Sequence, residues 1–177
     1  MKRYIVLLRA VMPSGRNKVP MAQLREALST GGFENVRTYI QSGNALVDTT
    51  LPASEVEQRV RALIKEHIGP DLAIVARTRD EVRKVLAGSP FRQGHDQSRV
   101  FFVLMATRPK AAKVKELLAE DFGDEKLAIA GSCAYLYIPG TYGRNRLSNN
   151  FIEKKLGVAA TMRNLNTLTK LVEISAE

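Results

Sequence analysis

The sequence predicts an α+β protein of two ferredoxin-like units packed together, each with the element order β-α-β-β-α-β, and an extra C-terminal helix. Short apolar runs of strand length alternate along the chain with amphipathic segments of helical period. This order occurs twice, so helices would cover one face of each of two sheets. We expect a first unit over residues 1–78, a linking helix and loop over 79–98, and a second unit with the C-terminal helix over 99–177.

The first unit is expected to begin with a strand, a helix and a hairpin. The nearly continuous apolar run at 3–9 is typical of a strand buried on both faces. Residues 20–32 predict a helix, because proline favours a first helical turn and the segment ends in two glycines. Its apolar stripe consists of Met21, Leu24 and Leu28. Residues 36–49 predict two strands joined by a tight turn at 42–44.

An amphipathic helix and a strand complete the first unit. Residues 52–69 have apolar side chains at helical spacing, and Ser54 with Glu57 three residues later matches a capping box. His67 near the C-terminal end of this helix suits the negative end of the helix dipole. The run at 72–78 predicts the fourth strand.

The second unit repeats this order after a helix and a polar loop. The expected elements are a strand at 99–106, a helix at 109–122, a hairpin of 125–131 and 133–139, a helix at 148–157, a strand at 158–162 and a last helix. Phe101 and Phe102 lie in a strand that we expect to belong to the core. Exposed aromatic residues for stacking on bases are therefore scarce, which argues against an RNA-recognition motif.

The net charge of +9 is concentrated at the two ends of the chain. Residues 1–25 carry six cations and no acid, residues 26–139 are balanced, and residues 140–177 carry six cations against three acids. If the two ends meet in space, such a field favours anionic partners. The alternative is a solvated basic surface that only aids solubility.

Cysteine, histidine and hydropathy limit the possible chemistry. Cys133 is the one cysteine, which excludes an internal disulfide and makes a cytoplasmic, reducing location the expectation. His67 and His95 show no metal-ligand spacing, so we expect no metal site and no cofactor. No apolar run approaches the roughly 20 residues of a membrane-spanning helix, and the oligomeric state stays open.

The segment "IPGTYGRNRLSNN" is typical of an anion site. Gly143 precedes Arg144 and Arg146 just before an expected helix. Amide groups at a helix N-terminus bind phosphate or carboxylate, and arginine adds paired donors. The alternative is that the glycines only allow the chain to turn.

The segment "TMRNLNTLTKL" opens the last helix. Asn164 or Asn166 is the natural N-cap, because its side chain can accept a hydrogen bond from the first helical turn. Arg163 is not explained by capping, since a cation at a helix N-terminus opposes the dipole. It needs either a carboxylate inside the protein or a bound anion outside it.

The chain resembles the bacterial family called domain-of-unknown-function family 1697. The matching segments are "YIVLLRAV", "NKVPMAQLREAL", "VRTYIQSGNALV", "SPF", "YLYIPG" and "LSNNFIEKKLGVAATMRNLNTLTKL". The resemblance implies a duplicated ferredoxin-like α/β architecture and no known activity. The chain departs from the family pattern at Ala10, Asn145 and Leu165, where the family usually has glycine, serine and tryptophan.

The functional hypothesis is one anion-binding surface on which the two basic ends converge. Its residues are Arg9, Arg16, Lys18 and Asn44 from the first half and Gly143, Arg144, Arg146, Arg163 and Asn164 from the second. The ligand would be a nucleic acid or a phosphorylated, nucleotide-like small molecule. The alternative is an enzyme acting on a small anionic substrate in a cleft between the units, with Tyr39, His95 and Asp96 as candidate acid–base groups. A protein-interaction module is a third possibility, for which the sequence gives no positive sign.

Overall fold

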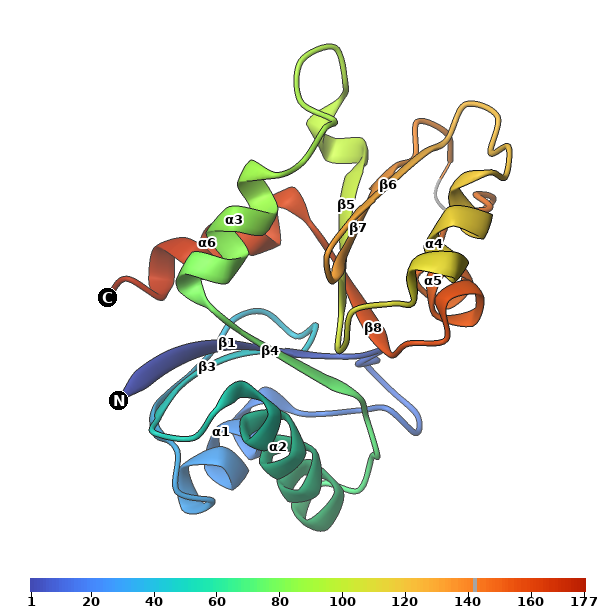
Figure 1. Cartoon of the computed structure of the whole chain (residues 1–177). Helices are drawn as coiled ribbons and strands as arrows, with labels where there is room; N and C mark the ends of the chain where they lie inside the picture. The colour runs from blue at the N-terminus through green and yellow to red at the C-terminus, as the bar shows by residue number, and fades with distance from the viewer. Residues whose placement is uncertain (142) are drawn as a thin grey trace. The chain divides into compact units, whose positions relative to one another are not determined.

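The computed structural model describes residues 1–141 and 143–177. This part of the chain contains six α-helices and two antiparallel four-stranded sheets, so the fold is mixed α+β (Figure 1). The elements are β1 (Lys2–Leu8), α1 (Met21–Thr30), β2 (Glu34–Thr38), β3 (Asn44–Thr49), α2 (Ala53–His67), β4 (Ile74–Thr78), α3 (Arg79–Ala87), β5 (Val100–Met105), α4 (Ala111–Leu118), β6 (Lys126–Ala130), β7 (Cys133–Tyr137), α5 (Asn149–Leu156), β8 (Ala160–Asn164) and α6 (Leu165–Ile174). The expected element order is present in both halves.

Contacts divide the chain into two compact units. Unit 1 comprises Met1–Val82 together with Leu171–Glu177, and unit 2 comprises Arg83–Lys170. The helices α3 and α6 therefore each supply residues to both units. Within unit 1, the end of α6 is bound by arginines: Arg37 Nη2 pairs with Glu177 Oε2 at 2.8 Å, and Arg79 Nε donates to the Val172 carbonyl at 3.2 Å.

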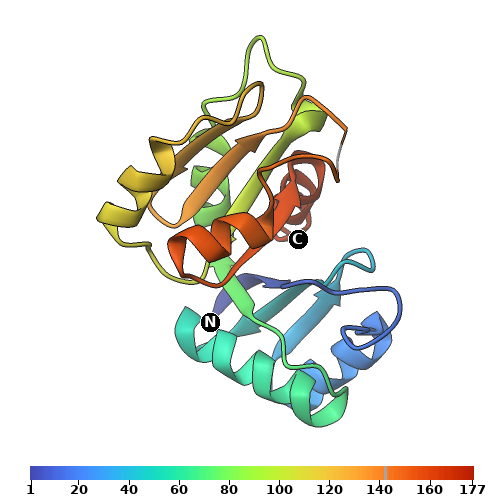
Figure 2. The same cartoon turned by 90° about the vertical axis from the view of Figure 1, so that its right-hand side faces the viewer.

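The sheet of unit 1 has the strand order β2-β3-β1-β4, with β1 between β3 and β4. The helices α1 and α2 cover one face of this sheet (Figure 2). Side chains of β1 alternate between the two faces, and both sets are buried: Tyr4 and Val6 pack into the core with α1 and α2, while Ile5 and Leu7 are fully buried as well. The expectation of a strand buried on both faces is confirmed.

The turn between β2 and β3 requires glycine at position 43. Gly43 has φ +80°, and a Cβ atom there would lie 2.6 Å from Val11 Cγ2 and 2.8 Å from Leu8 Cβ. The Leu8 amide donates to the Gly43 carbonyl at 2.8 Å. The chain that leaves β1 therefore packs directly on this turn.

The expected capping box of α2 is wrong. The helix begins after Pro52, which makes no side-chain cap, so Ser54 lies inside the first turn. Glu57 instead accepts hydrogen bonds from the Ala76 amide at 2.9 Å and from Arg77 Nη1 at 3.3 Å, on β4. Burial raises the pKa of the Glu57 carboxyl despite these bonds. The expected apolar stripe is confirmed, since Val56, Val60 and Ile64 are buried.

The sheet of unit 2 has the strand order β6-β7-β5-β8. The helices α4 and α5 cover one of its faces, where Val103 and Leu136 belong to the core (Figure 1). Phe102 is 1% exposed and Cys133 is buried, so both are core residues, as expected. Tyr135 Oη donates to the Val85 carbonyl at 3.0 Å, and burial raises the pKa of this phenol to about 12.

The last strand lies two residues later in the chain than expected, at Ala160–Asn164, and this changes the place of Arg163. The strand β8 extends past Met162, so Arg163 lies opposite Phe102 in the ladder with β5, and α6 begins only at Leu165. Arg163 is therefore not in the first turn of the helix, and the expected conflict with the helix dipole does not arise. Asn164 Oδ1 accepts a hydrogen bond from the Thr167 amide at 2.8 Å, which confirms Asn164 as the cap of α6.

Candidate anion-binding site

Arg16 and Lys18 lie together at a pocket on unit 1. The pocket has a volume of about 350 Å³ and is lined by Gly15, Arg16, Lys18, Pro20, Gln23, Ile68, Gly69 and Pro70. No acidic residue is among them. Both cationic side chains are exposed, and neither makes an ion pair or a side-chain hydrogen bond within the part of the chain that the structure describes. The charge of this pair is therefore available to an anion.

The loop between β1 and α1 is closed on itself, which positions these two cations. Met12 and Lys18 form an isolated parallel bridge, and the Met12 amide donates to the Asn17 carbonyl at 3.0 Å. The Lys18 amide donates to the Gly15 carbonyl at 3.3 Å, and Gly15 has φ +80° in open surroundings. The loop therefore turns sharply and delivers Arg16 and Lys18 to the start of α1.

The start of α1 supplies further donors to the same pocket. Pro20 precedes the helix and makes no side-chain cap, and the first helical bond runs from the Leu24 amide to the Pro20 carbonyl at 2.9 Å. The first amides of a helix have no partner within it, and their dipoles attract negative charge. Gln23, in this first turn, lines the pocket. Two cations and a helix N-terminus thus face one small cavity.

Sequence reasoning predicted Arg16 and Lys18 and missed the other residues that line this pocket. Pro20 and Gln23 had a usable signal, because a proline at a helix start leaves no side-chain cap for the amides that follow. Residues 68–70, at the end of α2, had none. Only the packing of α2 beside α1 brings them there.

Arg9 and Asn44 do not line this pocket. Arg9 is half-buried, and its amide donates to the Ala73 carbonyl at 3.0 Å. Asn44 is fully buried, and its Nδ2 donates to the Tyr39 carbonyl at 3.0 Å and to Ser42 Oγ at 2.9 Å. The side chain of Asn44 therefore stabilises the turn between β2 and β3.

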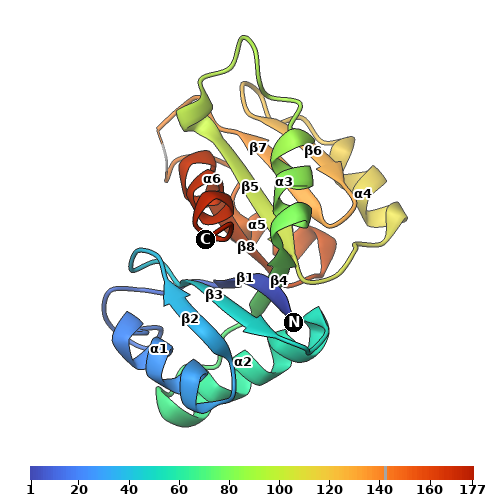
Figure 3. The same cartoon turned by 90° about the vertical axis from the view of Figure 1, so that its left-hand side faces the viewer.

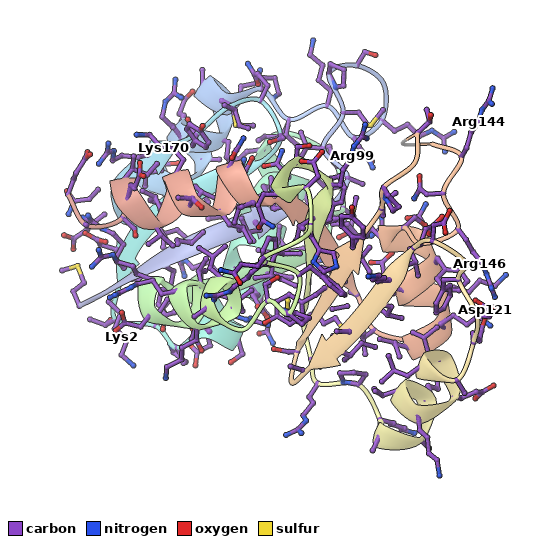
Figure 4. All side chains as sticks on the ribbon, turned by 90° about the horizontal axis from the view of Figure 1, so that it is seen from above. Lys2, Arg99, Asp121, Arg144, Arg146 and Lys170 are labelled. Atoms are coloured by element: carbon purple, nitrogen blue, oxygen red, sulfur yellow. The ribbon has the colours of Figure 1, made fainter. Side chains whose placement is uncertain are left out.

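In unit 2, the Arg144 side chain is exposed and extends into solvent (Figure 4). Its side chain makes no ion pair or hydrogen bond with any described residue. It lines a pocket of about 480 Å³, but Asp124 and Glu125 line the same pocket. Arg144 therefore faces a mixture of charges, unlike Arg16 and Lys18.

The amides of the glycine-containing loop have partners within the protein. Glu125 accepts from the Arg146 amide at 2.8 Å through Oε1 and from the Leu147 amide at 2.7 Å through Oε2. The Gly143 amide donates to Asn145 Oδ1 at 2.7 Å. The Glu125 carboxylate thus accepts the amide hydrogen bonds that were expected to bind a phosphate. The Arg144 side chain is then the group of this loop that can still contact an anion. Tyr142 of this loop lies outside the described residues.

Arg146 is held by its own unit. Its guanidinium pairs with Glu120, donates to the Asp121 carbonyl at 2.6 Å and lies 4.8 Å from the centre of the Phe122 ring. Figure 4 shows Arg146 beside Asp121. The hydrogen bond and charge of Lys155, together with the smaller effect of Arg146, lower the pKa of Glu120. These contacts tie the loop before α5 to the end of α4.

Arg163 lies in the interior. It is 8% exposed, and its Nη1 donates to Thr161 Oγ1 at 2.7 Å and to the Met162 carbonyl at 2.8 Å. Burial lowers the pKa of this guanidinium to about 10. Asn164, by contrast, is exposed.

The candidate acid–base groups do not form a catalytic pair in the described structure. Asp96 Oδ1 accepts from the Ser98 amide at 3.0 Å and from Ser98 Oγ at 2.7 Å, and these bonds lower the pKa of Asp96. Asp96 therefore caps the short helix that follows it instead of orienting His95. The His95 Nε2 atom lies 3.3 Å from Lys126 Nζ, and its ring meets Tyr137 edge to face at 4.7 Å.

Two further features are absent from residues 1–141 and 143–177. No group of three or more histidine, cysteine or acidic side chains in these ranges is placed to hold a metal ion. No helix in them combines the length and the apolar character needed to cross a membrane.

Comparison with known proteins identifies a family and a solved structure that are similar to this chain. The model of the family described as "Protein of unknown function (DUF1697)" matches residues 1–135. The conserved bacterial protein SP0830 from Streptococcus pneumoniae has a similar solved structure, with a TM-score of 0.76, 20% sequence identity and 98% of each chain covered. At this identity the likeness concerns the fold. No curated protein matches the chain.

Proposed function

We propose that this chain, which belongs to the DUF1697 family of unknown function, binds phosphate-containing anions through Arg16 and Lys18 near one chain end and Arg144 in the C-terminal stretch. One observation carries the proposal: Arg16 and Lys18 line a pocket at the uncapped start of α1.

Each unit is interpreted as a ferredoxin-like βαββαβ unit, which the strand orders β2-β3-β1-β4 and β6-β7-β5-β8 support.

The chemistry of the pocket favours phosphate. A guanidinium can donate two parallel hydrogen bonds to phosphate oxygens, and an ammonium adds a compact charge. Amides at a helix start complete the set of donors. A volume of about 350 Å³ is near the lower limit for small-molecule sites and accommodates a phosphate-bearing group. We assign Arg144, in unit 2, to a separate contact with ligands of the same class.

The ligand is a nucleic acid or a nucleotide-like molecule that is read through its phosphates. Base recognition on a sheet needs exposed aromatic rings, whereas Phe102 and Tyr135 are buried. Contacts with phosphate do not depend on base sequence. We therefore expect binding that is insensitive to sequence and sensitive to salt.

Fluorescence polarisation of labelled single-stranded RNA and DNA against increasing salt tests the proposal. The variant Arg16→Ala with Lys18→Ala is expected to bind on the order of tenfold more weakly than the wild type. The matched control, Lys2→Ala with Lys154→Ala, removes the same charge from two exposed lysines outside the pocket. Likewise, Arg144→Ala is compared with Lys154→Ala in unit 2.

The controls decide how the results are interpreted. Equal losses in the two double variants indicate attraction by the general charge of the protein and contradict a specific site. If neither nucleic acid binds at low salt, the same variants are titrated with nucleotides and inorganic polyphosphate. Absence of binding to all of these probes refutes the proposal.

A further inference from the structure

A second pocket on unit 2 is lined by residues of α4 and of the edge strand β6. Figure 3 shows that α4 lies beside β6. It has a volume of about 570 Å³. Its apolar lining consists of Pro109, Ala111, Val114, Leu118, Ala119 and Ile129. Positions three and four residues apart share one face of a helix, so Ala111, Val114 and Leu118 form a stripe along α4. Leu118 is 45% exposed, which shows that the protein itself leaves this stripe partly uncovered.

The strand beside this groove has a free and regular edge. Among the strands that the structure describes, β6 pairs with β7 alone, in an unbroken register from Lys126 opposite Tyr137 to Ala130 opposite Cys133. Lys126 is its one charged residue. Exposed edges of regular apolar strands accept an additional strand through their backbone groups.

The corresponding strand of unit 1 is protected, which makes the edge of β6 distinctive. The strand β2 is likewise at the edge of its sheet and adjacent to α1. Its register with β3 shifts between Glu34 and Arg37, and Asn35 has φ +48°. Arg25 on α1 also donates to Thr38 Oγ1 at 2.5 Å. Bulges and charges of this kind discourage an incoming strand, whereas β6 has no register shift and carries one charged residue, Lys126, at its first position.

The charge around the groove indicates which strand would fit. Arg108 and Lys115 line the groove, and no acidic residue does. A second copy of the chain docked on the same face would bring these cations close to their own equivalents, which is unfavourable. An acidic segment would pair with them.

We propose that the groove between α4 and β6 binds an extended peptide of a partner protein that is apolar at its centre and acidic at its ends. The peptide adds to β6 as a fifth strand. Alternate side chains then enter the apolar groove, and the terminal carboxylates meet Arg108 and Lys115. This surface is separate from the pocket at Arg16 and Lys18, so the two proposals can fail independently.

The probe is a fluorescein-labelled peptide Glu-Val-Thr-Val-Thr-Val-Glu, in which every second residue is valine and both ends are acidic. We expect a Kd below about 1 mM with the full chain. Amide shifts in a ¹H–¹⁵N correlation spectrum are expected along β6 and α4. Replacing both glutamates of the peptide with lysine is expected to abolish binding.

Matched variants within α4 separate the groove from the rest of the helix. Leu118→Glu and Lys115→Ala are each expected to weaken binding at least about fivefold. Ala112→Glu and Lys113→Ala alter exposed residues of the same helix that do not line the groove, and they are expected to leave binding unchanged. Circular dichroism verifies that each variant is folded.

Three results would overturn the proposal. The first is no binding of the probe at millimolar concentration. The second is equal weakening by Lys115→Ala and Lys113→Ala with no effect of Leu118→Glu, which indicates charge attraction alone. The third is a wild-type dimer in sedimentation that Leu118→Glu dissociates while the probe does not bind, because the groove would then be a contact between copies.

Discussion

Arg3 and Asp48 form a two-point ion pair between directly opposed residues of β1 and β3. Arg3 Nε lies 2.7 Å from Asp48 Oδ1, and Arg3 Nη2 donates to Oδ2 at 2.8 Å. Asn35 Nδ2 donates to the same carboxylate at 2.9 Å. The pair neutralises Arg3, one of the six cations of residues 1–25, so Arg3 is not available to a bound anion. Arg16 and Lys18 of the same stretch remain available.

Asp48→Asn is expected to destabilise the protein near pH 7 by about 1 kcal/mol. The hydrogen bond from Arg3 holds the pKa of Asp48 below its ordinary value of 3.8. The pair is therefore fully stabilising above that value, and its contribution is lost as the pH falls through the lower folded-state pKa. Urea unfolding at pH 7 and at about pH 3 measures this effect. The difference in free energy of unfolding between variant and wild type should be smaller at about pH 3. Equal free energies of unfolding near pH 7 would contradict this account.

Gly43→Ala is expected to cost at least about 2 kcal/mol more than Gly15→Ala. Both glycines have φ +80°, so the backbone penalty is the same in both variants. Only at Gly43 would the new methyl group lie within 3 Å of other atoms, on Val11 and Leu8. Thermal or urea unfolding measures the difference, and similar losses at the two positions would show that the loop after β1 adjusts easily.

Arg146→Ala and Arg144→Ala are expected to act on different properties. Arg146 holds Glu120 and the Asp121 carbonyl and lies over Phe122, so its loss should lower the Tm. Arg144 has no such contacts in the described residues, so its loss should weaken anion binding and leave the Tm unchanged. Differential scanning fluorimetry and polarisation report the two effects. A destabilised Arg144→Ala protein with unchanged affinity would reverse the assignment.

Asn164→Ala is expected to destabilise the protein by about 1 kcal/mol, because it removes the side-chain cap of α6. Asn166→Ala is the control, since Asn166 is exposed and does not cap the helix. Asn164→Asp retains the accepting oxygen and should keep most of the stability. If Asn164→Ala and Asn166→Ala unfold at the same urea concentration, the bond to Thr167 contributes little.

Periodicity predicted the elements well, because each strand and helix shows a local pattern. The continuous apolar run of β1 and the stripe of Met21, Leu24 and Leu28 on α1 are buried as expected. Asn164 was also identifiable, since capping depends on neighbouring residues alone. Features that depend only on neighbouring residues can therefore be predicted from a single sequence.

The remaining features depend on contacts between distant residues. Glu57 has the spacing of a capping box but bonds to Ala76 and Arg77 on β4. Arg163 resembles a helix-start residue, yet pairing with β5 keeps it in a strand. Glu125 accepts hydrogen bonds from the backbone amides of Arg146 and Leu147, in a loop about twenty residues later in the chain. No local sequence pattern predicts these contacts between distant residues.

The most decisive measurement is a titration of the ¹⁵N-labelled protein with inorganic tripolyphosphate, followed by ¹H–¹⁵N correlation spectra. The proposed site predicts shifts concentrated on residues 15–23 and 68–69, with saturation, and their loss in the variant with Arg16→Ala and Lys18→Ala. The control variant with Lys2→Ala and Lys154→Ala should retain them. Shifts that are absent from these residues, or that persist in the pocket variant, would contradict anion binding at the start of α1.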